Sequence, residues 1–247
     1  MRIDLAPHRG ALSRRELAGW LIVVIDVVRA SSTIARAMAS GARRIVPVAT
    51  LEEAMARKAE IEADVEARDP SLLLGGERRG LRPQEFDLGN SPREYTPAAV
   101  EGRVIVFSTT NGTRALRDAL GARETLIGAF LNLPAVADYL VRQEDDVLLV
   151  AVGRDGGPVL DDIVCAGMFV DRMVELAPAC RVTDAARMAC FAYQGYRGRV
   201  IDALRRSPSG QDLIKIGLEA DLADCAQIGV CAVVPRLANG EIRRAGA

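Results

Sequence analysis

A chain of 247 residues with 32 basic and 33 acidic side chains is long enough to bury a large core, as one α/β domain or two closely packed lobes. The formal net charge of -1 excludes a strong overall field, so we expect neither nucleic acid nor a membrane surface as a partner. The apolar runs are too short to span a membrane, and five cysteines without a CxxC pair or a secretory signal favour reduced thiols and a cytoplasmic location.

Short apolar runs alternate with helix-length amphipathic segments, a pattern typical of βαβ units. We therefore predict an α/β fold with a mostly parallel sheet and helices on both of its faces. Strands are predicted over 21–25, 44–48, 72–74, 104–107, 125–127 and 147–151. Helices are predicted over 33–40, onward from an N-capping Thr50, and over 135–141 and 160–176. A further helix, to about residue 120, follows the strand 104–107 and the polar segment 108–113.

Two stretches break this alternation. Residues 77–97 are rich in Gly, Pro, Asn and Asp, so we predict a long loop, and such loops in compact domains are often functional. After Pro178 the pattern is mainly helical, with strand signal only at 231–234 and 241–243. No Pro/Ser-rich linker separates this part, so we treat 1–247 as a single domain with a soft lobe boundary near residue 180.

Polar clusters follow several of the predicted strands, where ligands of parallel sheets bind. Asp26 ends a buried strand, and a carboxylate there could hold a hard cation or attack phosphorus itself. Arg29 and the hydroxyls after it precede a helix start, which favours an anion. The alternative is that Asp26 caps the loop and Ser31 or Ser32 caps the helix.

The second and third clusters lie in and before the long loop. Glu77 and Arg78 come directly after a diglycine at the end of a strand. Asp87, Asn90 and Ser91 follow within the loop, where the same residue types also build ordinary turns. Each cluster taken alone is therefore compatible with a purely structural role.

The fourth cluster, Thr109, Thr110, Asn111, Gly112 and Thr113, follows a strand and opens a helix. Hydroxyls, a permissive glycine and helix N–H groups together predict an oxyanion cradle. The chain has neither a GxxxxGK[ST] nor a GxGxxG motif, which disfavours a nucleoside triphosphatase or a dinucleotide enzyme.

The last cluster lies around the helix predicted at 160–176. Arg154 follows a strand, and Asp161 and Asp162 fall in the first helical turn, where acids complement the helix dipole or could serve Mg²⁺. The only histidine is His8, so a histidine-based hydrolase is disfavoured. Carboxylates and anion donors beyond strand ends thus predict metal-assisted phosphate chemistry.

Six strings occur in order: IDVVRASSTI, LLGGERRG, FDLGNSPREYTP, STTNGTRAL, IGAFLN and LDDIVCAG. Over about residues 20–175 the chain resembles the 2-phosphosulfolactate phosphatase family, with a weaker match in its C-terminal tail. The resemblance implies a three-layer α/β/α fold. It also implies Mg²⁺-dependent hydrolysis of 2-phospho-3-sulfolactate to 3-sulfolactate and phosphate, in coenzyme M biosynthesis.

Together the motifs and the resemblance define a set of site residues. The expected catalytic groups are Asp26, Arg29, Glu77 and Asp87, and the expected metal ligands are Asp26, Glu77, Asp87, Asp161 and Asp162. The expected substrate- or phosphate-binding groups are Arg29, Arg78, Asn90, Ser91, Thr109, Thr110, Asn111, Gly112, Thr113 and Arg154. Either water or an aspartate could attack phosphorus, and the haloacid-dehalogenase scheme is disfavoured because no DxDxT follows the first strand.

One stretch departs from the family pattern. Members often carry Ser-x-His-Gly-Arg in the C-terminal third, where this chain has Ser207-Pro208-Ser209-Gly210-Gln211. Two alternatives therefore stay open beside the leading hypothesis: a phosphatase of another small phosphorylated hydroxy acid, and an anion-binding module without turnover. A homodimer is a further expectation.

Overall fold

The computed structural model describes residues 1–12, 15–63 and 72–246. Its strands are β1 (Arg2–Ala6), β2 (Leu21–Ile25), β3 (Arg44–Val48), β4 (Leu72–Gly76), β5 (Val104–Ser108), β6 (Glu124–Gly128), β7 (Val147–Ala151), β8 (Arg181–Val182), β9 (Pro235–Ala238) and β10 (Glu241–Arg244). Its α-helices are α1 (Ala30–Ala39), α2 (Leu51–Ala63), α3 (Pro97–Val100), α4 (Gly112–Asp118), α5 (Leu133–Gln143), α6 (Leu160–Leu176), α7 (Asp184–Gln194), α8 (Val200–Arg206), α9 (Pro208–Lys215) and α10 (Ala220–Cys225). Short 3₁₀ turns are η1 (Arg9–Ala11), η2 (Pro92–Glu94) and η3 (Phe130–Asn132).

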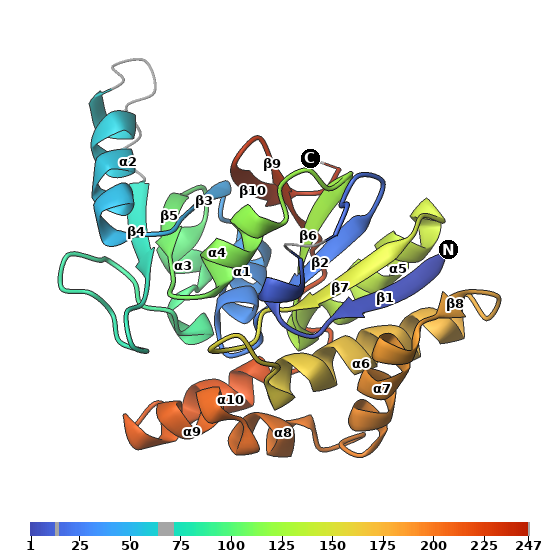
Figure 1. Ribbon diagram of the computed structural model, residues 1–247. Coiled ribbons are helices and arrows are strands. Elements are labelled where there is room, and N and C mark those ends of the chain that lie inside the picture. Colours follow the sequence, from blue (N-terminus) through green and yellow to red (C-terminus); the bar gives the residue numbers. More distant parts are fainter. Residues whose placement is uncertain (13–14, 64–71, 247) are drawn as a thin grey trace.

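The described strands form one mixed sheet in the order β4-β5-β3-β10-β9-β6-β2-β7-β1-β8 (Figure 1). Two groups of parallel strands, β4-β5-β3 and β6-β2-β7-β1-β8, are joined by the antiparallel hairpin β9–β10. In the longer group Leu21 of β2 is level with Glu124 of β6 and Val147 of β7. The sheet is therefore mostly parallel, as the sequence predicts.

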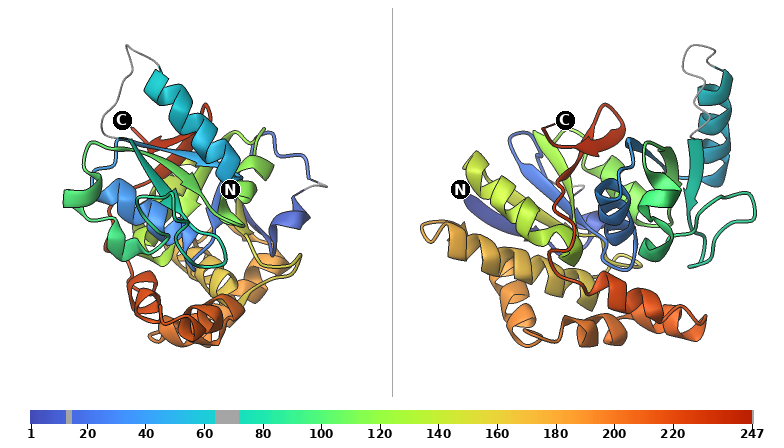
Figure 2. Two further views of the ribbon diagram at one scale, coloured as in Figure 1. Left: turned by 90° about the vertical axis from the view of Figure 1, so that its left-hand side faces the viewer. Right: turned by 180° about the vertical axis from the view of Figure 1, so that it is seen from behind.

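Alternate side chains of the buried strands enter different helical layers, because successive strand residues point to opposite faces. Leu21, Val23 and Ile25 pack with α5 to α8, whereas Ile22 and Val24 pack with α1 and α4. A smaller core lies between α2 and the outer face of β3, β4 and β5. Figure 2 shows helices on both sides of the sheet, which confirms the three-layer α/β/α fold.

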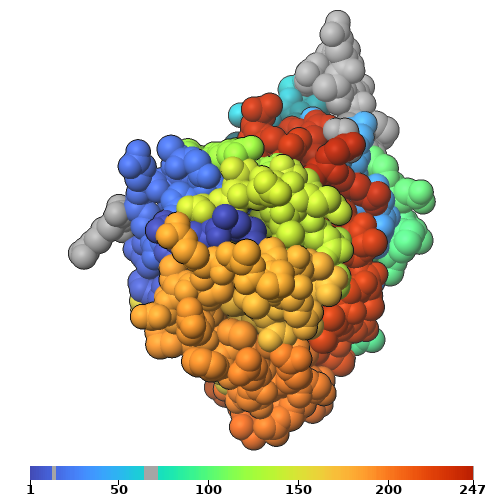
Figure 3. Space-filling view, turned by 90° about the vertical axis from the view of Figure 1, so that its right-hand side faces the viewer, coloured from blue at the N-terminus to red at the C-terminus, as the bar shows by residue number. Residues whose placement is uncertain are grey.

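The helices after residue 180 share the core of the earlier ones. Side chains of α7 and α8 belong to the same buried cluster as those of β1, β2, β7 and α6. In Figure 3 this helical layer, coloured orange, is joined to the red C-terminal segment, which runs up the molecule to β9 and β10. Within the ranges that the structure describes, no helix combines the length and apolar character needed to cross a bilayer.

Several predicted elements coincide with observed ones. The strands at 21–25, 44–48 and 147–151 and the helix at 160–176 have the predicted bounds. The prediction of a strand at 231–234 is wrong, because that segment runs past η3, where the Cys231 amide donates to the Leu131 carbonyl. The strand follows at Pro235–Ala238, since Asn239 and Gly240, both with positive φ, form the two-residue turn of the hairpin.

The hairpin β9–β10 gives a test of what joins the two strand groups. Ile242 of β10 is fully buried and level with Ile45 of β3. We predict that Ile242→Ala lowers the free energy of unfolding by about 2–5 kcal/mol, because a large side chain is removed from a packed core. Urea unfolding measures this, with Ile228→Ala as control, since Ile228 is 44% exposed and should change stability by less than about 0.5 kcal/mol. Equal effects of the two substitutions would contradict the central position of the hairpin.

Candidate active site

A cleft of about 450 Å³ lies where β2, β4, β5 and β7 end, and α9 closes one side of it. The predicted site residues that line it are Asp26, Arg29, Glu77, Asn90, Thr109, Thr110, Asn111 and Arg154. Ser209, from the stretch that departs from the family pattern, also lines it, as do four charged residues outside the predicted site set, namely Arg79, Asp155, Asp212 and Lys215. The structure thus brings the strand-end clusters together into one site.

Asp26 stands directly after β2, at the point where the chain turns into α1. Its backbone amide donates to Ser31 Oγ at 3.0 Å, and its carbonyl accepts from the Ser31 amide at 2.8 Å. Burial, together with the neighbouring carboxylates of Asp162 and Glu77, raises the pKa of Asp26 to about 8, although Arg29 acts in the opposite direction. Without a compensating cation, the Asp26 carboxyl therefore holds its proton at neutral pH.

The helix α1 begins directly after Arg29, three residues earlier than predicted. The hydroxyls of Ser31, Ser32 and Thr33 are consequently inside the helix and buried. They donate to the carbonyls of Val24, Val27 and Asn90, respectively. These hydroxyls fasten the turn around Asp26 and do not line the cleft.

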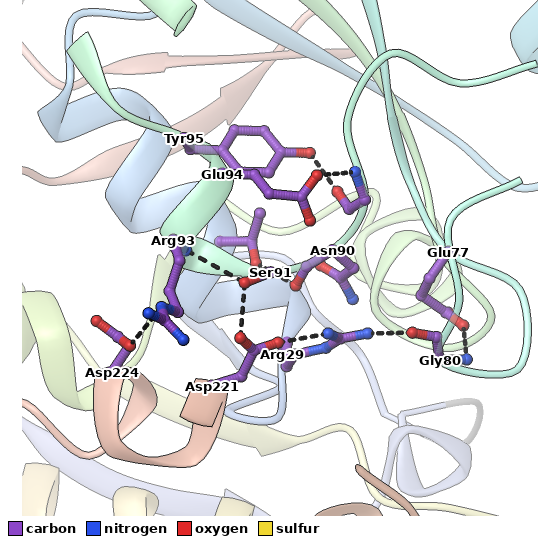
Figure 4. A network of polar contacts seen from close by, with 12 residues as sticks. Arg29, Glu77, Gly80, Asn90, Ser91, Arg93, Glu94, Tyr95, Asp221 and Asp224 are labelled. Carbon is purple, nitrogen blue, oxygen red and sulfur yellow. Dashed lines mark hydrogen bonds and ion pairs between the residues drawn. The ribbon is translucent and has the colours of Figure 1, made fainter. Parts of the chain in front are cut away.

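Arg29 is only 4% exposed and links two parts of the cleft wall. Its Nη1 donates to Asp221 Oδ2 and its Nη2 to the Gly80 carbonyl, both at 2.6 Å. The Gly80 amide then donates to Glu77 Oε2, and Glu77 Oε1 accepts from the Thr110 amide, both at 2.8 Å. Figure 4 shows the part of this chain from Asp221 through Arg29 and Gly80 to Glu77.

Two similar tight turns flank the cleft after β4 and β7. The turns 78–81 and 154–157 are each closed by a pair of backbone hydrogen bonds, between Arg78 and Leu81 and between Arg154 and Gly157. The two central residues of each have positive φ, as in a type I′ turn. Because of this turn, Arg79 lines the cleft and Arg78 does not.

Arg78 points into the protein instead. Its guanidinium donates to the carbonyls of Glu77, Ser108 and Ala49 and to the Ser108 hydroxyl. It ties the end of β4 to the end of β5, so Arg79 is the arginine of this turn that lines the cleft.

The predicted cradle at 109–113 divides into two parts. Thr109, Thr110 and Asn111 line the cleft, whereas Thr113 is buried and its hydroxyl donates to the Thr109 carbonyl at 2.9 Å. Gly112 lies against Asp26: a Cβ added there would be 2.8 Å from Asp26 Oδ2 and 2.7 Å from Ala30 Cβ. Glycine is therefore needed for the close approach of α4 to Asp26.

The acidic pair at the start of α6 is buried and does not line the cleft. Asp162 accepts the amides of Val27 and Gly153 at 2.8 and 3.0 Å, so it fastens the turns after β2 and β7 to each other. Burial raises the pKa of both Asp161 and Asp162, and Asp26 adds to the rise at Asp161. Oδ1 of Asp161 is buried without a hydrogen-bond partner.

Two more predicted residues lie outside the cleft lining. Asp87 is exposed and its carboxylate accepts the Leu74 amide at 2.8 Å, so it holds the long loop to β4. Ser91 is buried and donates to Asp221 Oδ1 at 2.7 Å. Asn90, which does line the cleft, is 5% exposed, and its side-chain Oδ1 has no partner among the described residues.

The helix α9 forms the side of the cleft opposite the strand ends. Arg154 donates to its Asp212 at 2.6 Å, and this bond and the nearby carboxylates raise the pKa of Arg154. A methyl group at Gly80 would lie 3.0 Å from Cδ1 of Ile216, so the first turn also packs against α9. Both type I′ turns are therefore held by this helix.

Carboxylates are plentiful in this region, but they are not gathered into one set of ligands. Within the ranges that the structure covers, no group of three or more His, Cys, Asp or Glu side chains is arranged to hold a metal ion. Asp26 and Glu77 are the two predicted ligands that line the cleft.

Comparison with known proteins adds an independent finding. The family described as 2-phosphosulpholactate phosphatase matches residues 8–240. A protein of Symbiobacterium thermophilum named "Probable 2-phosphosulfolactate phosphatase" is 41% identical over 227 residues, covering 92% of this chain and 95% of the relative. Proteins with the same name from Clostridium acetobutylicum and Caldanaerobacter subterraneus subsp. tengcongensis are 35% and 34% identical, covering 98% and 94% of this chain and 100% and 94% of their own.

The raised pKa of Asp26 predicts a stability effect that needs no substrate. A free aspartate titrates near pH 3.9, so between about pH 4 and pH 8 the folded state binds more protons at Asp26 than the unfolded state. Asp26 therefore lowers the free energy of unfolding as the pH rises through this window. In chelator, Asp26→Asn should gain stability relative to the wild type from pH 5 to pH 8, by a few kcal/mol.

Urea unfolding at the two pH values measures this gain. Asp155→Asn serves as the control, because this cleft residue has a side chain that is 90% exposed and should leave the pH dependence unchanged. A stability difference between Asp26→Asn and wild type that is the same at both pH values would be inconsistent with a raised pKa of Asp26.

Proposed function

The chain belongs to the 2-phosphosulpholactate phosphatase family, and on that premise we propose that it hydrolyses 2-phospho-3-sulfolactate to 3-sulfolactate and inorganic phosphate with Mg²⁺. Membership makes the protein a phosphoric monoester hydrolase. The observation that carries the proposal is the cleft itself, in which Asp26 and Glu77 lie beside Arg29, Arg79 and Arg154. Carboxylates next to several cations suit a metal-assisted reaction of an anion.

The different exposure of the cationic side chains in the cleft supports one orientation of the substrate, with its phosphate innermost. Arg29 is buried beside Asp26, whereas the side chains of Arg154 and Lys215 are 41% and 71% exposed. The phosphate would lie deep, near Asp26 and Arg29, with the sulfonate and carboxylate toward the mouth. Arginine suits such groups because its planar fork binds two oxygens at once.

A Mg²⁺ ion fits the residues present at the floor of the cleft. The raised pKa values of Asp26 and Asp161 and the unpartnered Oδ1 of Asp161 mark a place where negative charge lacks compensation. Mg²⁺ commonly takes one or two protein carboxylates and completes its shell with water and phosphate oxygens. Asp26 would hold it, with Glu77 as the second cleft carboxylate, and Asp161 and Asp162 would add negative charge beneath.

The protein side chains account for most of the requirements of phosphoryl transfer, which depends on position and charge neutralisation. Arg29 would neutralise the phosphoryl oxygens, while Thr109, Thr110 and Asn111 would bound the other side of the group. When bound, Mg²⁺ would supply further charge neutralisation and a lowered pKa for water. In the overall reaction an oxygen of water bonds to phosphorus, the P–O bond to the lactate carbon skeleton breaks, and the alcohol leaves with a proton.

A second candidate substrate class is favoured by one observation. Ser209 lines the cleft from α9, and it occupies the place of the histidine in the Ser-x-His-Gly-Arg pattern. A smaller, neutral hydroxyl at this position would change which group the protein binds at the end of the substrate distant from the phosphate. Another small phosphorylated hydroxy acid, with a carboxylate and no sulfonate, is therefore the alternative ester.

A panel of esters tests these proposals. With Mg²⁺ we expect phosphate release from 2-phospho-3-sulfolactate at a higher kcat/KM than from 2-phospholactate and 3-phosphoglycerate, and no release after treatment with EDTA. A higher kcat/KM for a sulfonate-free ester would contradict 2-phospho-3-sulfolactate as the substrate and support the alternative substrate class. Full turnover by metal-stripped enzyme in EDTA would overturn the role of Mg²⁺, and no turnover of any ester would leave an anion-binding module.

The close approach of α4 to Asp26 gives a sharper test of the site. We predict that Gly112→Ala lowers kcat/KM by about 100-fold, because the new methyl group must displace the Asp26 carboxylate or the start of α4 by a sizeable part of an ångström. Gly195→Ala is the matched control, since its added Cβ would have no neighbour closer than 3.4 Å. Wild-type kinetics in a folded Gly112→Ala protein would show that Asp26 is not part of the reacting centre.

A further inference from the structure

The ion pair between Arg29 and Asp221 is the most deeply buried one in the described part of the cleft wall. The side chains of Arg29 and Asp221 are 3% and 4% exposed, and their atoms Nη1 and Oδ2 are 2.6 Å apart. Asp221 belongs to α10, in the C-terminal helical layer, 192 residues from Arg29 in the chain. Neither composition nor motif singles out this aspartate.

Both oxygens of Asp221 are engaged. Oδ2 accepts from Arg29, and Oδ1 accepts from the Ser91 hydroxyl at 2.7 Å. Ser91 follows Asn90, whose carbonyl accepts from Thr33 of α1 at 2.8 Å. The carboxylate is therefore fixed in one orientation by contacts from two sides (Figure 4).

A purely stabilising role explains this pair poorly. Removing two charges from water costs several kcal/mol per ion, and apolar replacements of buried pairs are often as stable or more stable. Unlike an apolar contact, the ion pair fixes the orientation of the Arg29 guanidinium, which lines the cleft. The remaining N–H groups of Arg29 can then face an anion without a search over side-chain rotamers.

We propose that Asp221 is a positioning residue for the hydrolysis, acting through Arg29; this inference rests on the proposed function. Ser91 donates to Asp221, and Asp221 accepts from the Arg29 guanidinium. The guanidinium donates in turn to the Gly80 carbonyl, and the Gly80 amide donates to Glu77. The C-terminal helical layer thereby sets the position of two groups on the cleft floor. Without the carboxylate, Arg29 is free to turn toward the neighbouring acids Glu77 and Asp26.

The chain contains a matched control for this inference. Asp224 lies one turn further along α10 and pairs with Arg93 at 3.5 Å, but these side chains are 27% and 55% exposed and neither lines the cleft. Asp221→Asn and Asp224→Asn remove the same charge from the same helix. They differ in whether the lost partner is Arg29.

Steady-state kinetics and binding of inorganic phosphate to the Mg²⁺-loaded enzyme test the inference at a temperature where all variants are folded. We expect Asp221→Asn to lower kcat/KM by about 100-fold and to weaken phosphate binding at least tenfold. Asp224→Asn should stay within about twofold of wild type in both, since exposed pairs contribute little. Wild-type kinetics and phosphate affinity in Asp221→Asn, with only a lowered Tm, would overturn the inference and leave a structural pair.

Ser91→Ala keeps the ion pair and covers the case in which Asp221→Asn fails to fold. It should weaken phosphate binding severalfold on its own. Where Asp221→Asn does fold, the losses of the two substitutions should not add in the double variant, because both act on Arg29. Wild-type phosphate affinity in Ser91→Ala, or additive losses, would contradict the inference. A wild-type protein without activity would reject the proposed function. The role of Asp221 in positioning Arg29 would still be tested, because the phosphate affinities of the variants can be compared without turnover.

Discussion

The buried guanidinium of Arg29 is the point at which the walls of the cleft meet. It bonds to the carboxylate of Asp221 on the C-terminal layer and to the carbonyl of Gly80 in the turn after β4. Through Gly80 the connection continues to Glu77 and to Thr110 at the end of β5. Four segments distant in sequence are therefore linked by one chain of hydrogen bonds that passes through Arg29, and the shape of the cleft depends on the position of this side chain.

A second constraint is the cost of burying acidic side chains at and near the cleft. Burial raises the pKa of Asp26, Asp161 and Asp162, because the ionised form of each carboxyl group is less stable in the protein than in water. Such strongly shifted groups are typical of functional sites. The hydrogen bonds of Asp162 to the turns after β2 and β7 show how the fold holds these turns together despite that cost.

The sequence predicts the parts of this site that depend on local pattern. Buried strands ending in Asp26 and before Thr109 could be recognised because apolar runs and strand-end polar residues are local signals. Arg79 was missed because the choice between it and Arg78 depends on positive φ at two turn residues, although Arg79-Gly80 and Asp155-Gly156 are weak hairpin signals. Asp221 could not have been found, since its role exists only through a contact 192 residues away.

A crystal structure of the enzyme with Mg²⁺ and orthovanadate, a mimic of the transferring phosphoryl group, would test the central claim most directly. The account predicts vanadate at the floor of the cleft, contacting the Arg29 guanidinium, with the metal on Asp26 and the bond from Arg29 to Asp221 intact. Vanadate bound only at the rim, against Arg154 and Lys215, with Arg29 and Asp26 contacting neither anion nor metal, would contradict it.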